Sequence, residues 1–193
     1  MDKVSRAALV NWTICIEAFL LLVATVWSYL AGIALQPALM LNAKAALIGA
    51  GAGCVTAFGG YVLFLATRNL GAFAQLRELV EGYLSPMLTE LKPLDLVVLA
   101  VVSGFCEEVF FRGVAQAQLQ LVITSICFGL FHDPTFRHPS YAIIAFLYGL
   151  ALGWLYIYTG NLWAPIVAHM VHNLISLYVL RYKIKPPASA VRP

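Results

Sequence analysis

Charge is what this sequence has least of. Only 11% of its 193 residues are Asp, Glu, Lys or Arg, whereas soluble domains carry about 25%. Hydrophobic residues make up 62% of the chain, and the mean hydropathy is +0.85. So few charges cannot cover a water-exposed surface, and the composition therefore predicts an integral membrane protein. The length predicts one domain that covers residues 1–193.

Other absences exclude further classes. The net charge of +3 is dispersed among hydrophobic segments rather than gathered on one face, so no nucleic-acid partner is expected. Strand-like alternation does not rise above the hydrophobic background, and no internal repeat is present. The four cysteines form no CxxC pair, which argues against a disulfide framework or a zinc knuckle; they are Cys15, Cys54, Cys106 and Cys127. The predicted fold class is therefore all-α.

Hydrophobic segments of this chain predict about six transmembrane helices, since one crossing needs about 20 apolar residues. They cover approximately residues 9–35, 43–67, 94–119, 120–132, 141–158 and 162–182, of which the fourth is short. Residues 68–93 carry apolar side chains at helical spacing between charged ones, which predicts an amphipathic helix on the membrane surface. That helix would be either a connector or an element that guides substrate. The expected architecture is a polytopic helical bundle.

The distribution of basic residues predicts the orientation. Six crossings put both termini on the same side of the membrane, and Lys44 is the basic residue expected on the other side. The side of the termini would carry ten: Lys3, Arg6, Arg68, Arg77, Lys92, Arg137, Arg181, Lys183, Lys185 and Arg192. By the positive-inside rule, both termini are predicted to be cytoplasmic.

Several charged residues interrupt the apolar segments. Glu107, Glu108 and Arg112 lie within the third one, where each charge in hydrocarbon costs about 2.5 kcal/mol or more and usually marks function. Glu108 and Arg112 are four positions apart and can pair on one helix face. Glu107 points about 100° away from Glu108, so the two acids need not share one role. Glu17 in the first segment either pairs within the bundle or takes part in catalysis.

Two further segments contribute polar residues. His132 ends the fourth segment, and the sixth contains His169, His172 and Asn173. Any one of them could be a hydrogen bond between helices, but the combined set is typical of hydrolytic chemistry. A carboxylate and a neutral imidazole can together deprotonate a water molecule. A His and an Asn can donate hydrogen bonds to a developing oxyanion.

A cysteine nucleophile and a metal centre are the two alternative kinds of chemistry. A nucleophilic Cys106 is disfavoured because it points to a different part of the helix from Glu107. A metal is the stronger competitor, since zinc accepts carboxylate and imidazole ligands; the ligand types present are Glu107, His132, His169 and His172. However, HExxH is absent, and Arg112 beside the site would oppose a divalent cation. We therefore expect no cofactor, with zinc as the minority alternative.

Three ordered motifs resemble those of the CPBP family, the CAAX-protease and bacteriocin-processing group, also called Abi, of intramembrane glutamic endopeptidases. Residues 107–112 match its EExxxR motif, residues 128–132, which begin with Phe128, match FxxxH, and residues 169–173 match HxxxN. The resemblance covers a family-like core of about residues 95–180. The first two segments match only in being hydrophobic.

The resemblance implies a role for each motif residue. Glu107 would activate the water together with His132, while His169 and Asn173 would form the oxyanion hole. Glu108 and Arg112 would be a supporting pair that orients the site. Phe128 and His172 are interpreted as side chains that pack behind the catalytic ones; His172 lies outside the motif.

The implied activity is hydrolysis of a peptide bond near the terminus of a membrane-associated protein or peptide, with or without a lipid anchor. The expected partners are membrane lipids and such a substrate. Two alternatives stay open. One is a metal-dependent membrane protease. The other is a non-catalytic transporter, immunity or scaffold protein, since intramembrane Glu, His and Arg also build ion paths.

Overall fold

The computed structural model describes residues 5–67, 69–133 and 137–184. Within these ranges every regular element is helical, as the composition predicted. Four basic residues used to predict the orientation, Lys3, Arg68, Lys185 and Arg192, lie outside the described residues. The elements are α1 (Arg6–Leu30), α2 (Gln36–Leu39), α3 (Ala43–Thr67), η1 (Gly71–Phe73), α4 (Ala74–Arg77), η2 (Glu78–Leu84), α5 (Ser85–Leu88), α6 (Pro93–Glu108), η3 (Val109–Ala115), α7 (Gln116–His132), α8 (Pro139–Thr159) and α9 (Trp163–Tyr182).

Four helices of the described residues, α1, α3, α8 and α9, are long and apolar enough to cross a membrane. They support an integral membrane protein. The predicted number of six crossings is not confirmed, because α6 and α7 have only 16 and 17 residues. A π-helical segment, η3, follows α6 and separates it from α7. A topology with six crossings stays a prediction, in which α6 and η3 together would form one membrane crossing.

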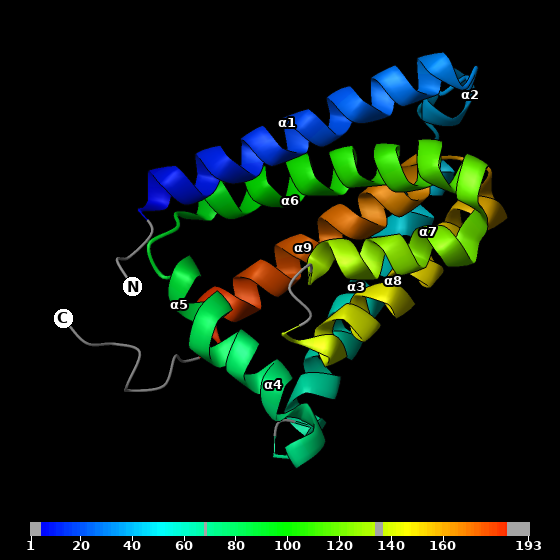
Figure 1. Ribbon diagram of the computed structural model, residues 1–193. Helices are drawn as coiled ribbons and strands as arrows, with labels where there is room; N and C mark the ends of the chain where they lie inside the picture. The colour runs from blue at the N-terminus through cyan, green and yellow to red at the C-terminus, as the bar shows by residue number, and fades with distance from the viewer. Residues whose placement is uncertain (1–4, 68, 134–136, 185–193) are drawn as a thin grey trace.

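The chain reverses its direction inside α7. Gln120 has a φ of 64° and a ψ of 170°, which no residue of a right-handed helix adopts. Up to this residue the chain continues the direction of α6, and beyond it α7 runs back towards its starting end (Figure 1). The non-helical residue Gln120 coincides with the predicted boundary between the third segment, 94–119, and the fourth, 120–132.

Helix α1 ends five residues earlier than the sequence analysis expected. Its last residue is Leu30, and Gly32 then adopts a positive φ of 67°, a conformation that ends many helices. Gln36 and Pro37, which follow the predicted segment 9–35, begin the short α2. Proline is tolerated there because the first turn of a helix has no partner for its missing N–H.

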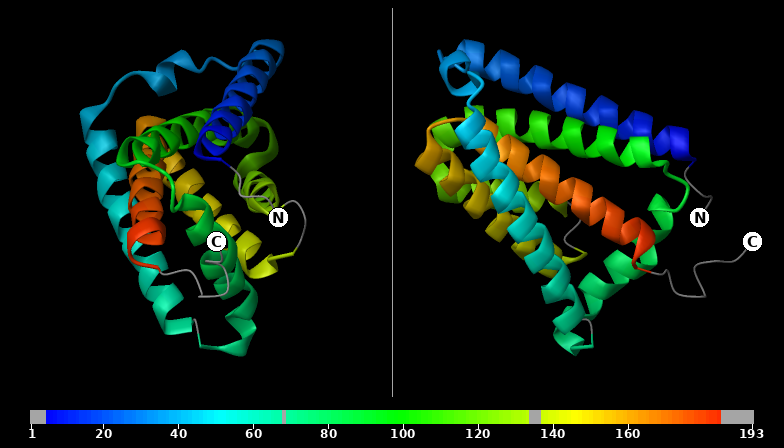
Figure 2. Two further views of the ribbon diagram at one scale, coloured as in Figure 1. Left: turned by 90° about the vertical axis from the view of Figure 1, so that its left-hand side faces the viewer. Right: turned by 180° about the vertical axis from the view of Figure 1, so that it is seen from behind.

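Most of the long helices pack against helices that are not their neighbours in sequence. Helix α1 lies along α6, α6 lies along α9, α9 lies along α3, and α7 packs against α8. The views in Figure 2 show that these helices are close together near α2 and diverge towards the opposite end. There the residues of η1, α4, η2 and α5 cross the open side, with Leu76 and Leu88 buried. This is the segment for which an interfacial amphipathic helix was predicted.

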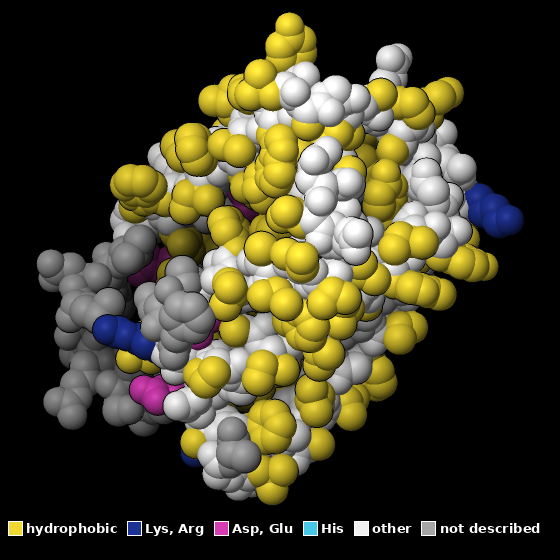
Figure 3. Space-filling model, turned by 45° about the vertical axis from the view of Figure 1, so that its right-hand side comes forward, with side chains coloured by type: hydrophobic (Ala, Val, Ile, Leu, Met, Phe, Trp, Pro, Cys, Tyr) yellow, Lys and Arg dark blue, Asp and Glu magenta, His cyan; other side chains and the backbone are white. Residues whose placement is uncertain are grey.

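The outer surface of the bundle is apolar. Yellow hydrophobic side chains cover most of the face in Figure 3, with few charged groups among them. Large side chains such as Leu47, Val55 and Trp154 are more than half exposed. In a soluble protein such a surface would aggregate, whereas in a bilayer it contacts lipid chains. The exposed apolar surface therefore agrees with a membrane environment.

Two glycines of α3 allow it to approach α9 closely. A Cβ atom at Gly49 would overlap the backbone carbonyl of Ala164, and one at Gly53 would lie 2.5 Å from that of Ala168. Small residues at four-residue spacing are typical of tightly packed membrane helices. The intervening Gly51 has no heavy atom within 4 Å of its would-be Cβ. Only one face of the glycine-rich run is therefore used for helix packing.

Candidate active site

A cavity of about 500 Å³ lies between α1, α3, α6, α7, α8, α9 and the segment from α4 to α5. Its volume falls in the range of small-molecule and peptide side-chain sites. The polar groups on its wall come from Thr13, Glu17, Tyr61, Ser103, Glu107, His132, Tyr141, His172, Asn173 and Ser176. Most of the remaining wall is aliphatic or aromatic, and includes Leu9, Phe64, Leu76, Leu84, Leu99 and Leu180. The cavity thus combines a small polar area with a large apolar one.

Glu107 and His132 face each other across the cavity. Oε2 of Glu107 is 3.8 Å from Nε2 of His132, which is too long for a direct hydrogen bond. Nδ1 of His132 lies 2.9 Å from the carbonyl oxygen of Phe128. A carbonyl oxygen only accepts, so Nδ1 carries the proton and donates it. In the neutral ring, Nε2 is then an acceptor that faces the carboxylate.

A second acid lies behind the cavity wall and has different partners. Oε2 of Glu108 is 3.2 Å from Nε of Arg112, and its Oε1 is 2.9 Å from Nδ1 of His169. Glu108 and Arg112 are fully buried, and His169 is 2% exposed. The guanidinium of Arg112 also lies over the ring of Phe128, with its central carbon 4.7 Å from the ring centroid. These charges are held in one ion-paired group, although the guanidinium nitrogens of Arg112 have no hydrogen-bond partner among the described residues.

Asn173 joins the cavity wall through Ser103. Its Nδ2 donates a hydrogen bond of 2.9 Å to Oγ of Ser103. Ser103 stands four positions before Glu107, so both side chains occupy one face of α6. An amide nitrogen has two hydrogens, and one of them is left for a ligand in the cavity. Ser103 was not among the predicted site residues, although its spacing of four positions from Glu107 places both on one helix face.

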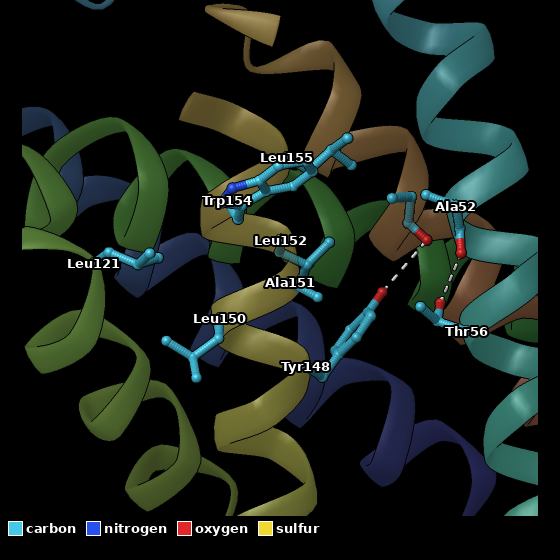
Figure 4. A pocket seen from close by; sticks show the side chains of 10 residues that line it. Ala52, Thr56, Leu121, Tyr148, Leu150, Ala151, Leu152, Trp154 and Leu155 are labelled. Carbon is cyan, nitrogen blue, oxygen red and sulfur yellow. Dashed lines mark hydrogen bonds between the residues drawn. The ribbon is translucent and has the colours of Figure 1, made fainter. Parts of the chain in front are cut away.

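His172 lies between the cavity and α3. Its Nδ1 is 3.1 Å from Oγ1 of Thr56, whose hydroxyl donates to the carbonyl of Ala52. The His172 ring stacks on Tyr148 with the ring centroids 4.3 Å apart. Tyr148 in turn donates to the carbonyl of Ala168 at 3.4 Å (Figure 4). These contacts hold His172 in place.

Tyr148 and Thr56 also belong to a second cavity of about 500 Å³, whose lining is almost entirely apolar. Figure 4 shows Leu150, Leu152 and Leu155 on its α8 side, with Ala52 and Thr56 facing them from α3. His172 of the first cavity contacts this one through Thr56 and Tyr148, whereas Glu107 and His132 do not line it. It offers no chemistry, and its surface suits a lipid chain.

The structure gathers the predicted residues into two adjoining groups. Glu107, His132 and Asn173 line the cavity, while Glu108, Arg112 and His169 form the buried group beside it. Phe128 is fully buried and lies between the groups, with its ring centroid 4.4 Å from that of His132 and 5.9 Å from that of His169. Within the described part of the chain, no three His, Cys, Asp or Glu residues are grouped so that they could hold a metal ion.

Fold and site together define a helical membrane protein with an internal carboxylate–imidazole site. Residues 89–175 match the family model described as Type II CAAX prenyl endopeptidase Rce1-like, which belongs to the CPBP family. All three motifs lie inside the matched residues. The match confirms the family resemblance that those motifs predicted.

A curated relative gives a second comparison. The uncharacterized protein YpbD of Bacillus subtilis (strain 168) is 32% identical over 95 residues, which are 46% of this chain and 47% of the relative. The match therefore spans about half the length of this relative. No solved structure matches the chain.

Proposed function

We propose that this protein is an intramembrane endopeptidase in which Glu107 and His132 activate a water molecule. The observation that carries the proposal is the pair of acceptors, Oε2 of Glu107 and Nε2 of His132, at 3.8 Å from each other. Oε2 is buried and has no hydrogen-bond partner in the described chain. Two facing acceptors need a donor between them, and one water molecule can give a proton to each. A water held in this way is ready to be deprotonated.

The oxyanion of the tetrahedral intermediate would be stabilised by Asn173 and His169. Asn173 has a second amide hydrogen beyond the one that it donates to Ser103. His169 donates from Nδ1 to the Glu108 carboxylate, so it can donate from Nε2 only as an imidazolium ion. That charge would lie beside the Glu108 carboxylate, which also faces Arg112. This assigns Glu108 a task different from that of Glu107.

The reaction balances without a cofactor. Glu107 takes a proton from water while the hydroxide adds to the carbonyl carbon of the scissile bond. The carbon–nitrogen bond then breaks, and the leaving amine takes that proton from Glu107. The products are a carboxylic acid and an amine. Each proton transfer of this kind contributes typically 10²- to 10⁴-fold, as an order-of-magnitude expectation.

The substrate class follows from the cavity and the family. The aliphatic wall suits an apolar segment, and the family description names a prenyl endopeptidase. We propose a protein or peptide that has a membrane-associated segment near the scissile bond, with or without a lipid anchor. The segment from α4 to α5 contributes Leu76, Val80 and Leu84 to the wall, so it would contact this part of the substrate.

The decisive experiment compares the wild type with Glu107→Gln. Membrane proteomics of cells that carry each form should reveal a protein whose terminus is trimmed only by the wild type. Cleavage of that protein by purified enzyme in proteoliposomes should be lost in Glu107→Gln and kept in Glu90→Gln, which alters an exposed acid. Full cleavage by a folded Glu107→Gln would refute the proposal. Loss of activity after exhaustive chelation would favour the metal-dependent alternative.

A further inference from the structure

A second acid lines the cavity beside Glu107, and it comes from a helix outside the three motifs. Glu17 belongs to α1, lines the same cavity as Glu107, and is only 4% exposed. Its carboxyl group lies within hydrogen-bonding reach of that of Glu107. Oε2 of Glu17 has no hydrogen-bond partner in the described chain. A carboxyl group in hydrocarbon is costly, so its position beside Glu107 calls for a physical reason.

The packing of α1 on α6 fixes this position. At the starting ends of the two helices, Nε and Nη2 of Arg6 each donate a 2.6 Å hydrogen bond to one oxygen of Asp95. Bidentate pairs of this kind are strong and geometrically specific. Glu17 follows Arg6 by eleven positions and Glu107 follows Asp95 by twelve. At about 1.5 Å per residue, the two acids lie at nearly the same depth in parallel helices (Figure 1).

Two carboxylates in contact inside an apolar cavity cannot both be ionised, because like charges repel strongly where water is excluded. The ionisable groups around the pair include Cys106 on α6, His132 on α7, Tyr141 on α8, Tyr61 on α3 and His172 on α9. The uncharged polar side chains of the same cavity are Thr13, Ser103, Asn173 and Ser176. Arg112, a permanent cation of this region, is held against Glu108 instead. One proton between Glu17 and Glu107 is therefore the simplest way to satisfy both.

Building on the proposed function, we infer that Glu17 is a positioning residue that shares one proton with Glu107. Oε2 of Glu107 faces His132, which leaves Oε1 to accept a hydrogen bond from the protonated Glu17. The bond would hold the Glu107 carboxylate towards the water while keeping it ionised. Glu17 would thus act through Glu107 without touching the substrate.

Infrared spectroscopy of the wild-type protein tests the shared proton directly. A protonated carboxylic acid absorbs apart from a carboxylate, and isotopically labelled glutamate identifies the band as glutamic acid. We expect such a band at neutral pH in the wild type and in Glu90→Gln, and its loss in Glu17→Gln. A spectrum without this band, or one that Glu17→Gln leaves unchanged, would overturn the inference.

Kinetics separates positioning from mere packing. Gln at position 17 can still donate a hydrogen bond to Glu107, whereas Leu fills a similar volume without a donor. We expect kcat to fall about tenfold or more in Glu17→Leu, with KM within about twofold of the wild type, and most of the activity to be kept in Glu17→Gln. Equal activity of the two folded variants would contradict positioning. The proposed function fails separately, through Glu107→Gln, so the two outcomes can be told apart.

Discussion

Nε2 of His132 faces Oε2 of Glu107 at 3.8 Å, although the two residues belong to different helices. The reversal at Gln120 brings them together. Glu107 lies thirteen positions before Gln120 and His132 twelve positions after it, so the chain runs out and back by almost equal lengths. The pair therefore depends on the backbone of one residue that carries no catalytic group.

Removing the imidazole of His132 should reduce activity without unfolding the protein. We expect His132→Gln to lower kcat by about 10²- to 10⁴-fold, because the water loses one of its two acceptors. The measurement is cleavage of the identified substrate in proteoliposomes, with circular dichroism to check the fold. His138→Gln is the matched control, since His138 does not line the cavity that contains Glu107. Equal activity of both variants would remove His132 from the mechanism.

Asn173 and Ser103 should differ in their effect on the reaction. Asn173→Ala removes a donor to the oxyanion and should lower kcat by about 10²- to 10³-fold. Ser103→Ala removes only the group that orients the amide, so its effect should be smaller. Both variants should bind substrate with similar KM. A larger loss in Ser103→Ala than in Asn173→Ala would assign the direct contact to the serine.

Breaking the Glu108–Arg112 pair should destabilise the fold. Arg112→Leu leaves a buried carboxylate without its cation, and such a change typically costs about 3–5 kcal/mol. The double variant Glu108→Gln/Arg112→Met removes both charges and should recover much of the stability. Thermal unfolding midpoints in detergent provide the comparison. If the double variant were less stable than Arg112→Leu, the pair would not be the source of the effect.

Gly49 and Gly51 provide a matched pair of substitutions on α3. Gly49→Ala would place a Cβ against the carbonyl of Ala164 and force α3 away from α9, at a cost of about 1–3 kcal/mol. Gly51→Ala meets open space and should be neutral or slightly stabilising. The unfolding midpoint of Gly49→Ala should therefore be lower than that of Gly51→Ala. Equal midpoints would show that this helix contact contributes little.

Much of the architecture could be predicted because lipid exposure leaves a strong mark on sequence. The second segment, 43–67, has the bounds of α3, and the break at Gln120 falls where two segments were separated. The predicted end of the first segment at residue 35 was wrong, because the apolar run continues beyond Gly32, where the positive φ ends the helix. The number of membrane crossings stays a prediction, since hydropathy cannot decide how a helix interrupted by a π-helical segment sits in a bilayer.

The available chemistry can be seen in the sequence alone: two adjacent acids, a nearby arginine and the histidine motifs, in a chain too apolar for water. The sequence also indicated that Glu107 and Glu108 point in different directions, because adjacent residues of a helix are turned by about 100°. Only the tertiary structure decided which partner each acid meets. Glu107 meets His132 and Glu17, whereas Glu108 meets Arg112 and His169. The physical reason is that these contacts join residues of different helices, whose relative depth and rotation are set by packing at Gly49, Gln120 and the Arg6–Asp95 pair.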